Sequence, residues 1–187
     1  MYLKQLFFTS VLSLSLLQAQ SSVGLDINDE DLEILVSIDL NSFADYSDST
    51  SYLVDGYYLN TDGDDLFALG ISGQNTFQGV EGLTLGFGAG LVFADDFMAL
   101  PLFGKVLYTL PLIDTIPTTS LGATFAYAPS VLTFDDAQSY TEFRFEANME
   151  VIQSIHLFAG YRNIETEYKR YDKTFNDSYY AGMKLSF

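Results

Sequence analysis

Residues 140–151 read YTEFRFEANMEV, and this stretch decides the fold. One set of alternate positions carries no charge: Thr141, Phe143, Phe145, Ala147, Met149 and Val151. The positions between them are polar, and four of these five are ionisable: Glu142, Arg144, Glu146, Asn148 and Glu150. A period of two predicts a β-strand, because successive side chains of a strand point to opposite faces.

The same alternation recurs along the chain, with turn-forming residues between the runs. The nine candidate strands are residues 32–41, 52–59, 67–73, 83–93, 100–110, 120–127, 140–151, 155–162 and 178–187. No helical period, second domain, linker or low-complexity tract interrupts them. The pattern predicts a single all-β domain of antiparallel strands.

Composition excludes several classes of protein. The chain has 187 residues, 25 acidic against 8 basic side chains and a formal net charge of −17, so we expect no nucleic-acid partner. With 48% hydrophobic residues it is not an intrinsically disordered chain. The lack of Cys excludes disulfides, thiol catalysis and Cys-based zinc sites. We expect no cofactor and no bound metal.

Residues 1–19 have the pattern of a secretory signal peptide. A charged start containing Lys4 precedes the apolar run LFFTSVLSLSLL (residues 6–17) and the small residue Ala19. The apolar run is shorter than the roughly 20 residues that a transmembrane helix needs. We therefore expect cleavage after Ala19, export of the protein, and a folded domain formed by residues 20–187.

The polar faces of the strands distinguish a soluble barrel from a transmembrane one. They are rich in small residues that suit a crowded lumen better than a solvated surface: Gly86, Gly88, Gly90, Gly122, Ala126, Gly160 and Gly182. Aromatic residues stand near strand ends, as they do in the interfacial girdles of membrane barrels. Together with the export signal, these features predict an outer-membrane β-barrel.

An even strand number is expected for such a barrel, so a strand must precede residues 32–41. Residues 22–28 (SVGLDIN) are the available candidate, giving ten strands, with eight as the alternative. With both termini in the periplasm, residues 152–154, 112–118 and 78–82 form short periplasmic turns. Residues 168–177, 130–138 and 61–65 then form longer outer loops.

Three short motifs resemble a known family. They are Gly82-Leu-Thr-Leu-Gly-Phe-Gly-Ala-Gly90, Tyr127-Ala-Pro-Ser130 and Ala159-Gly-Tyr-Arg-Asn-Ile164, the last followed by a Tyr- and Gly-containing final strand. They resemble the YfaZ-type outer-membrane proteins, and the similarity runs from about Asp31 to the end. The resemblance implies a small barrel in the outer membrane of Gram-negative bacteria and supplies no reaction, substrate or site residue.

The final strand resembles an assembly signal. Apolar or aromatic side chains occupy every second position of its last part: Tyr179, Ala181, Met183, Leu185 and Phe187. We expect the outer-membrane assembly machinery to recognise this pattern through the C-terminal Phe187.

Seven charged residues are expected to project into the lumen: Lys105, Glu142, Arg144, Glu146, Glu150, Arg162 and Lys184. They form either an ion-selective constriction or a salt-bridged plug, and the narrow interior favours the plug. No catalytic residue is expected, since the sole histidine, His156, follows the turn at residues 152–154 and so lies at the periplasmic mouth. Asp62-Gly-Asp-Asp65 lacks the spacing of a calcium loop and is read as a solvated turn.

We therefore expect a monomeric barrel with a filled or narrow lumen and a structural or surface-interaction role. A narrow ion or small-solute channel is the first alternative, and a lipid-modifying enzyme is the second. The segment 20–65 carries 12 acidic and no basic side chains. This charge motivates a hypothesis that acidic loops interact with the divalent ions that bridge lipopolysaccharide.

Overall fold

The computed structural model describes residues 21–43, 50–95, 97–112, 117–169 and 172–187. The expected signal peptide, residues 1–19, lies outside these residues. Strands dominate the described part, accompanied by one 3-10 turn at Leu40–Ser42. No helix in these ranges is long and apolar enough to cross a membrane.

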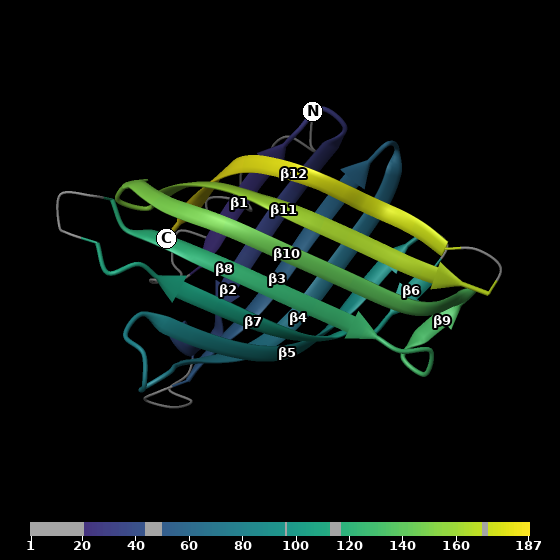
Figure 1. Cartoon of the computed structure of the whole chain (residues 1–187), viewed down its shortest axis with the longest axis horizontal. Helices are drawn as coiled ribbons and strands as arrows, with labels where there is room; N and C mark the ends of the chain where they lie inside the picture. The colour runs from purple at the N-terminus through teal and green to yellow at the C-terminus, as the bar shows by residue number, and fades with distance from the viewer. Residues whose placement is uncertain (1–20, 44–49, 96, 113–116, 170–171) are drawn as a thin grey trace.

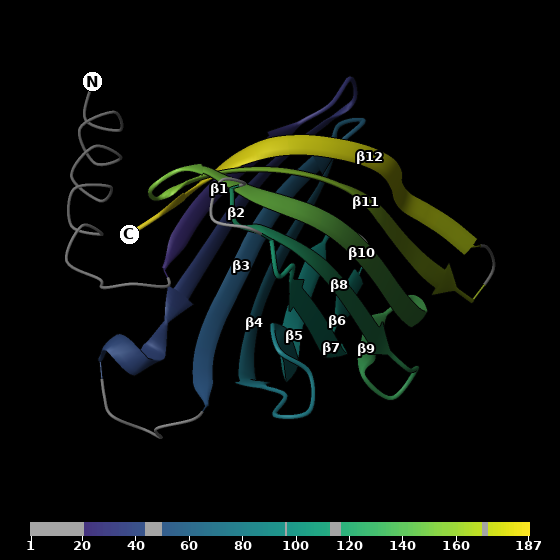
Figure 2. The same ribbon diagram turned by 60° about the vertical axis from the view of Figure 1, so that its left-hand side comes forward.

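Ten antiparallel strands form a closed barrel, as predicted (Figure 1). They are β1 (Ser22–Ile27), β2 (Asp31–Asp39), β3 (Ser51–Thr61), β4 (Asp64–Thr76), β5 (Leu83–Ala94), β7 (Leu102–Thr109), β8 (Thr119–Ala128), β10 (Ala137–Ile152), β11 (Ile155–Tyr168) and β12 (Asp172–Ser186). Figure 2 shows the sheet curving around an interior.

The barrel closes where the first strand pairs with the last. β1 and β12 are antiparallel, with Ser22 opposite Ser186 and Ile27 opposite Ala181. Beyond the strands, the backbone N–H of Phe187 donates to the carbonyl of Ser21 at 2.9 Å. Both ends of the barrel domain therefore lie at one mouth, which we call the terminal end, and the opposite mouth is the far end.

Two short strands at the far end were not predicted. β6 (Phe97–Ala99) pairs with the last residues of β5 and also with β9 (Thr133–Asp135). Both lie in connections that join barrel strands at the far end (Figure 1). They carry apolar side chains to the far mouth, where Phe97 and Ala99 are buried.

The prediction of long outer loops was wrong. β11 continues to Tyr168 and β12 begins at Asp172, so strands occupy most of the predicted 168–177 loop. β9 and the start of β10 lie within the predicted 130–138 loop. Residues 61–65 form a hairpin whose turn, Asp62-Gly63, has positive φ angles of 52° and 87°. The strands continue because their far-end side chains pack on a buried cluster inside the mouth.

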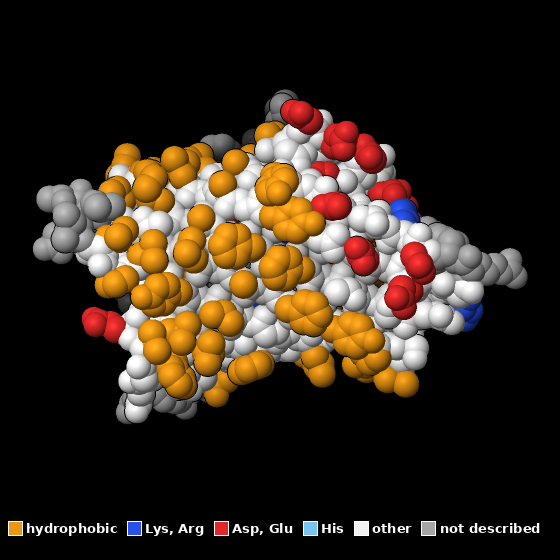
Figure 3. Space-filling view, in the orientation of Figure 1, with side chains coloured by type: hydrophobic (Ala, Val, Ile, Leu, Met, Phe, Trp, Pro, Cys, Tyr) orange, Lys and Arg blue, Asp and Glu red, His pale blue; other side chains and the backbone are white. Residues whose placement is uncertain are grey.

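The face of the barrel drawn in Figure 3 is divided into two zones. Exposed apolar side chains cover the part nearer the terminal end, and acidic side chains gather at the far end. Examples of the apolar zone are Phe87 (74% exposed), Leu102 (61%) and Tyr179 (80%). Exposing so large an apolar surface to water would be energetically unfavourable, whereas lipid chains would cover it. We call this zone the apolar belt, and it identifies a transmembrane barrel.

Close backbone contacts explain some of the inward-facing glycines. A Cβ atom at Gly182 would lie 2.3 Å from the carbonyl oxygen of Leu25 and 2.6 Å from the ring of Phe158. At Gly122, by contrast, the nearest atom would be the Leu107 side chain at 3.7 Å. The β1–β12 seam therefore requires glycine at 182, while position 122 has room for a side chain.

We expect Gly182→Ala to lower the free energy of unfolding by about 1–3 kcal/mol, as overpacking of a filled interior does. Gly122→Ala is the matched control and should leave stability nearly unchanged. Urea titration of the reconstituted protein, followed by the gel mobility of unheated samples, measures both. Equal stability of the two variants would contradict the close packing of the seam.

Candidate functional site

An apolar cluster fills the far mouth of the lumen. Its buried members are Leu59, Leu66, Ala68, Val92, Phe97, Ala99, Ala128, Ala137, Tyr140, Ile164, Tyr168 and Phe175. Phe97 is 2% exposed, and its ring centroid lies 5.8 Å from that of Tyr140, 6.3 Å from Tyr168 and 6.4 Å from Phe175. The unpredicted strand β6 thus brings a phenyl ring between the far ends of β10, β11 and β12.

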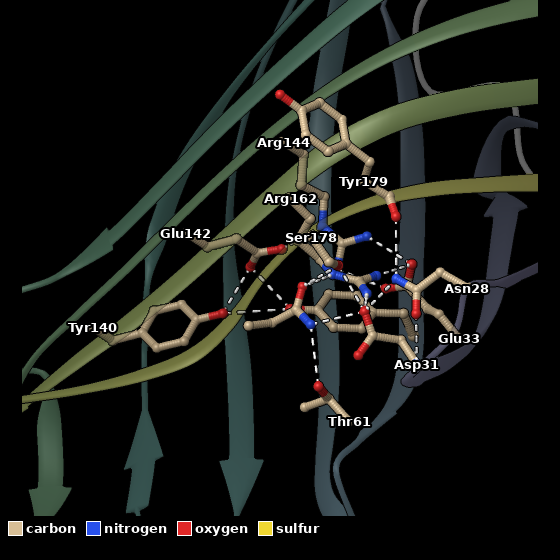
Figure 4. A network of polar contacts seen from close by, with 12 residues as sticks. Asn28, Asp31, Glu33, Thr61, Tyr140, Glu142, Arg144, Arg162, Ser178 and Tyr179 are labelled. Carbon is tan, nitrogen blue, oxygen red and sulfur yellow. Dashed lines mark hydrogen bonds and ion pairs between the residues drawn. The ribbon is translucent and has the colours of Figure 1, made fainter.

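Below this cluster lies a layer of buried charges, drawn in part in Figure 4. We define the charged layer as Asp26, Asp31, Glu33, Glu142, Arg144 and Arg162. The side chain of Arg162 is 0% exposed and makes three contacts. Its Nη1 donates to Glu33 at 2.6 Å, its Nη2 to Asp31 at 3.3 Å, and its Nε to Asn176 at 2.9 Å.

Arg144 is the second cation of the layer and connects β10 to β2 across the lumen. Its Nε donates to Glu142 at 2.5 Å and its Nη1 to Glu33 at 3.0 Å. The guanidinium carbon also lies 4.1 Å from the centroid of the Tyr57 ring. Glu142 in turn accepts from Tyr57 at 2.9 Å and from Tyr140 at 2.8 Å. These contacts leave the guanidinium group little freedom to move.

The layer holds more carboxyl groups than guanidinium groups. Asp26 lies directly opposite Glu33 in the β1–β2 pair and is 1% exposed. Both of its side-chain oxygens are buried without a hydrogen-bond partner among the described residues. Asp31 has several hydrogen-bond donors around it. Ser178 donates to it at 2.6 Å, Asn28 at 2.7 Å and Asn176 at 2.9 Å.

A cavity of about 400 Å³ occupies the lumen beside the charged layer, and its wall includes Ala68 and Val92 of the apolar cluster. Its lining extends from Arg144 to Ser22 and Gln74, near the terminal end. Two ion pairs lie in its wall. Lys105 contacts Asp55 at 2.5 Å, and Lys184 contacts Glu146 at 3.2 Å. Each of these four side chains is between 23% and 29% exposed, so they remain accessible within the lumen.

The structure places the seven charged residues expected in the lumen in different surroundings. Glu142, Arg144 and Arg162 meet in the charged layer, whereas the Lys105 and Glu146–Lys184 contacts lie separately in the cavity wall. Glu150, near the terminal end, has no ion-pair partner among the described residues. His156 lies opposite Glu150 in register, and its Nδ1 lies 3.1 Å from the side-chain oxygen of Asn148.

Sequence reasoning missed the acidic partners of the arginines. Glu33 occupies an inward position of the predicted 32–41 strand, Asp31 directly precedes that strand, and Asp26 occupies an inward position of the 22–28 candidate. Acidic residues at alternate positions of an otherwise apolar strand were the available signal. Asp55 was harder to identify, because the alternation in residues 52–59 is weak.

The carboxylates of the far-end hairpin are engaged by neighbouring side chains. Asp65 accepts from the Tyr58 hydroxyl at 2.6 Å and from Asn60 at 2.7 Å. Asp64 contacts Lys173 at 2.6 Å. No cluster of three or more metal-ligating side chains occurs in the part of the chain that the structure describes.

A family described as YfaZ precursor matches residues 3–187 of the chain. The chain belongs to the YfaZ precursor family. No curated protein sequence matches this family member.

Several solved structures are similar to this family member at low identity. One is a bacterial polysaccharide outer membrane secretin, with a TM-score of 0.48 and 12% identity over 89% of this chain and 68% of that chain. The KdgM porin has a TM-score of 0.44 and 8% identity over 90% of this chain and 99% of that one. The NanC porin has a TM-score of 0.43, also at 8% identity, with the same two coverages of 90% and 99%.

The fold and the family together identify an outer-membrane β-barrel. Closed antiparallel barrels with an even number of strands and an outward apolar band are the architecture of bacterial outer-membrane proteins. This family member has ten such strands and an apolar belt of exposed side chains.

Removing Arg162 should strongly destabilise the barrel. We expect Arg162→Met to lower the free energy of unfolding by about 3–5 kcal/mol, because it leaves Glu33 and Asp31 buried without their cation. Lys173→Met, which breaks the exposed contact to Asp64, is the control and should cost about 1 kcal/mol or less. Urea unfolding in lipid vesicles compares the two. Similar losses in both variants would show that the charged layer is not a buried ion network.

Proposed function

We propose that this protein is a non-conducting outer-membrane barrel with a structural or surface-interaction role. The observations that support the proposal are two packed groups of side chains in the lumen, the apolar cluster at the far mouth and the charged layer. A solute crossing the barrel would have to pass the apolar cluster.

The apolar cluster supports closure because it is packed like a protein core. Leu59, Leu66, Ala99 and Ile164 are each 0% exposed. Core side chains of this kind interdigitate with few voids large enough for water. A hydrated ion entering from the far end would have to lose its water shell to enter this cluster, which is costly.

The charged layer supports closure for a different reason. Both guanidinium groups are bonded to Glu33 on β2, and Arg144 is also bonded to Glu142 on its own strand, β10. Separating a buried ion pair leaves an uncompensated charge, at a cost of about 3–5 kcal/mol. A conducting path would require several such contacts to separate together.

The proposed orientation places the terminal end in the periplasm and the far end outside the cell. The far end then presents the exposed carboxylates to the outer leaflet, where the proposed partners are lipopolysaccharide and the divalent ions that bridge it. Exposed members of this group include Asp29, Glu30, Asp62, Glu165, Glu167 and Asp172. Lipids surround the apolar belt, and no second chain is required to cover it, in keeping with a monomer.

A narrow channel is the first alternative, favoured by the cavity of about 400 Å³ and its accessible lysines. A channel would need a route past Arg144 and Phe97 to the far mouth. Both are packed against neighbours in the structure, so the channel is the weaker reading.

A lipid-modifying enzyme has less support. Ser178 donates to Asp31 at 2.6 Å, but Asp31 is only 4% exposed and also accepts from Asn28, Asn176 and Arg162. A general base must reach its substrate's proton and have a lone pair free for it. His156 lies near the opposite mouth, bonded to Asn148. We therefore propose a non-enzymatic role.

Conductance across a planar lipid bilayer tests the closure. We expect no openings from the wild-type protein or from Phe134→Ala, which removes an exposed ring on β9. The double variant Phe97→Ala/Arg144→Ala removes one group from each closing layer and should give small, irregular openings. Discrete wild-type openings whose ion preference changes in Glu146→Gln would overturn the proposal in favour of a channel.

Recognition by the assembly machinery is tested at the last residue. The side chains of Tyr179, Ala181, Met183 and Leu185 are exposed on the outside of β12. A partner protein could bind them there before the barrel closes. We expect Phe187→Ala to reduce the folded fraction in cells severalfold, with Phe187→Tyr close to wild type. Refolding of Phe187→Ala into vesicles without any other protein should be normal. An equal loss in cells and in vesicles would make Phe187 a purely structural residue.

A further inference from the structure

The cavity beside the charged layer has the dimensions of a ligand site. Its volume of about 400 Å³ falls within the roughly 300–1,000 Å³ typical of pockets that bind small molecules. Its wall includes Ala68 and Val92 of the apolar cluster, so the cavity ends against that cluster and is blind towards the far mouth. A molecule occupying it would enter from the terminal end.

Most of the cavity wall is apolar. Leu35, Leu53, Phe103 and Leu107 line it from three different strands, and Gly122 leaves its part of the wall without a side chain. Such a surface gains free energy by covering hydrocarbon, at about 25 cal/mol per Å² of apolar area removed from water. The body of a ligand that fits this wall is an apolar chain.

Each lysine of the cavity wall has N–H donors that its carboxylate partner does not use. An ammonium group has three N–H donors, and Lys105 uses one of them on Asp55 while Lys184 uses one on Glu146. Asp55 is well occupied, since it also accepts from Ser37 at 2.7 Å and from Ser72 at 3.4 Å. The remaining N–H groups of both lysines are available to a ligand oxygen.

The two lysines lie on different sides of the cavity. Lys105 is on β7 and Lys184 on β12, with β8, β10 and β11 between them in the sheet order. Each ammonium group lies over an aromatic ring, Lys105 at 5.2 Å from the Phe103 centroid and Lys184 at 4.8 Å from that of Phe158. Charge-assisted hydrogen bonds from such groups favour a carboxylate or similar anion over a neutral head.

We propose that this cavity binds a single-chain anionic amphiphile, its chain against the leucines and its anionic head on Lys105 or Lys184. The inference goes beyond the proposed role and does not depend on it, because a blind binding pocket and a structural barrel are compatible.

Decanoate is the probe. Full-length protein extracted from cell envelopes is reconstituted in phosphatidylcholine nanodiscs, and carboxyl-¹³C decanoate is titrated in by NMR, with empty nanodiscs correcting for partition into lipid. We expect one saturable site per barrel. Unlabelled decanol should compete at least tenfold more weakly than unlabelled decanoate, corresponding to the loss of one charge-assisted bond, and decylamine more weakly still.

Gly122→Leu is the decisive variant. A Cβ atom at this position would have only ordinary van der Waals neighbours, the nearest at 3.7 Å, and the residue lines the cavity, so the fold should tolerate the larger side chain while the site is filled. Ala159→Leu, which adds the same group to the exposed outer face of β11, is the matched control. We expect Gly122→Leu to abolish saturable binding and Ala159→Leu to leave it unchanged, with gel mobility of unheated samples verifying the folding of each.

Lys105→Gln/Lys184→Gln provides a second, independent test that keeps a hydrogen-bond donor beside each carboxylate. It should weaken decanoate binding about tenfold or more and bring it close to the affinity of decanol. Saturable binding that survives in Gly122→Leu would overturn the proposed location. Equal affinity for decanoate and decanol in the wild type, or no saturable binding at all, would overturn the proposed ligand class.

Discussion

Hydrocarbon offers no hydrogen-bond partner to a peptide group, so a chain that crosses a bilayer as strands must pair all of them within itself. The β1–β12 seam meets this requirement by joining the two ends of the domain residue by residue. Closure of the barrel then determines which strands face each other across the lumen. It brings β2, which precedes the long strands, across the lumen from β10 and β11, and it is this meeting that places Glu33 between Arg144 and Arg162.

The strands could be predicted because lipid on one side and a crowded lumen on the other impose a strict alternation, as in residues 140–151. The far ends of the strands could not be predicted in this way. Residues 168–177 contain Lys, Asp and Asn in the proportions of a loop, and the burial of Tyr168 and Phe175 depends on Phe97, which arrives from a distant connection. The inward orientation of each arginine could be predicted from the alternation of its own strand. Its acidic partners could not, because they depend on which strands face each other once the barrel is closed.

The lumen changes chemistry along its length, and each part solves a different packing problem. Near the far end the barrel is filled as a soluble protein is, by Phe97 and its aromatic neighbours. In the middle, charged groups from β2, β10 and β11 pair with one another, because an unpaired charge there would cost several kcal/mol. In the cavity wall, Gly122 leaves room for a side chain. The glycines of the polar faces thus have two roles. Gly182 allows close backbone contact, and Gly122 leaves space in the cavity wall.

The separation of the apolar belt from the acidic far end also bears on how the barrel enters a membrane (Figure 3). If the domain inserts from the periplasmic side, its far end must cross the hydrocarbon first, carrying exposed carboxylates such as Glu165, Glu167 and Asp172. Each ionised carboxylate at the centre of a bilayer costs about 3 kcal/mol. The same free-energy cost opposes movement of the far end back across the bilayer, so an inserted barrel cannot turn over. Its sidedness is fixed at insertion and kept by kinetics for the life of the protein.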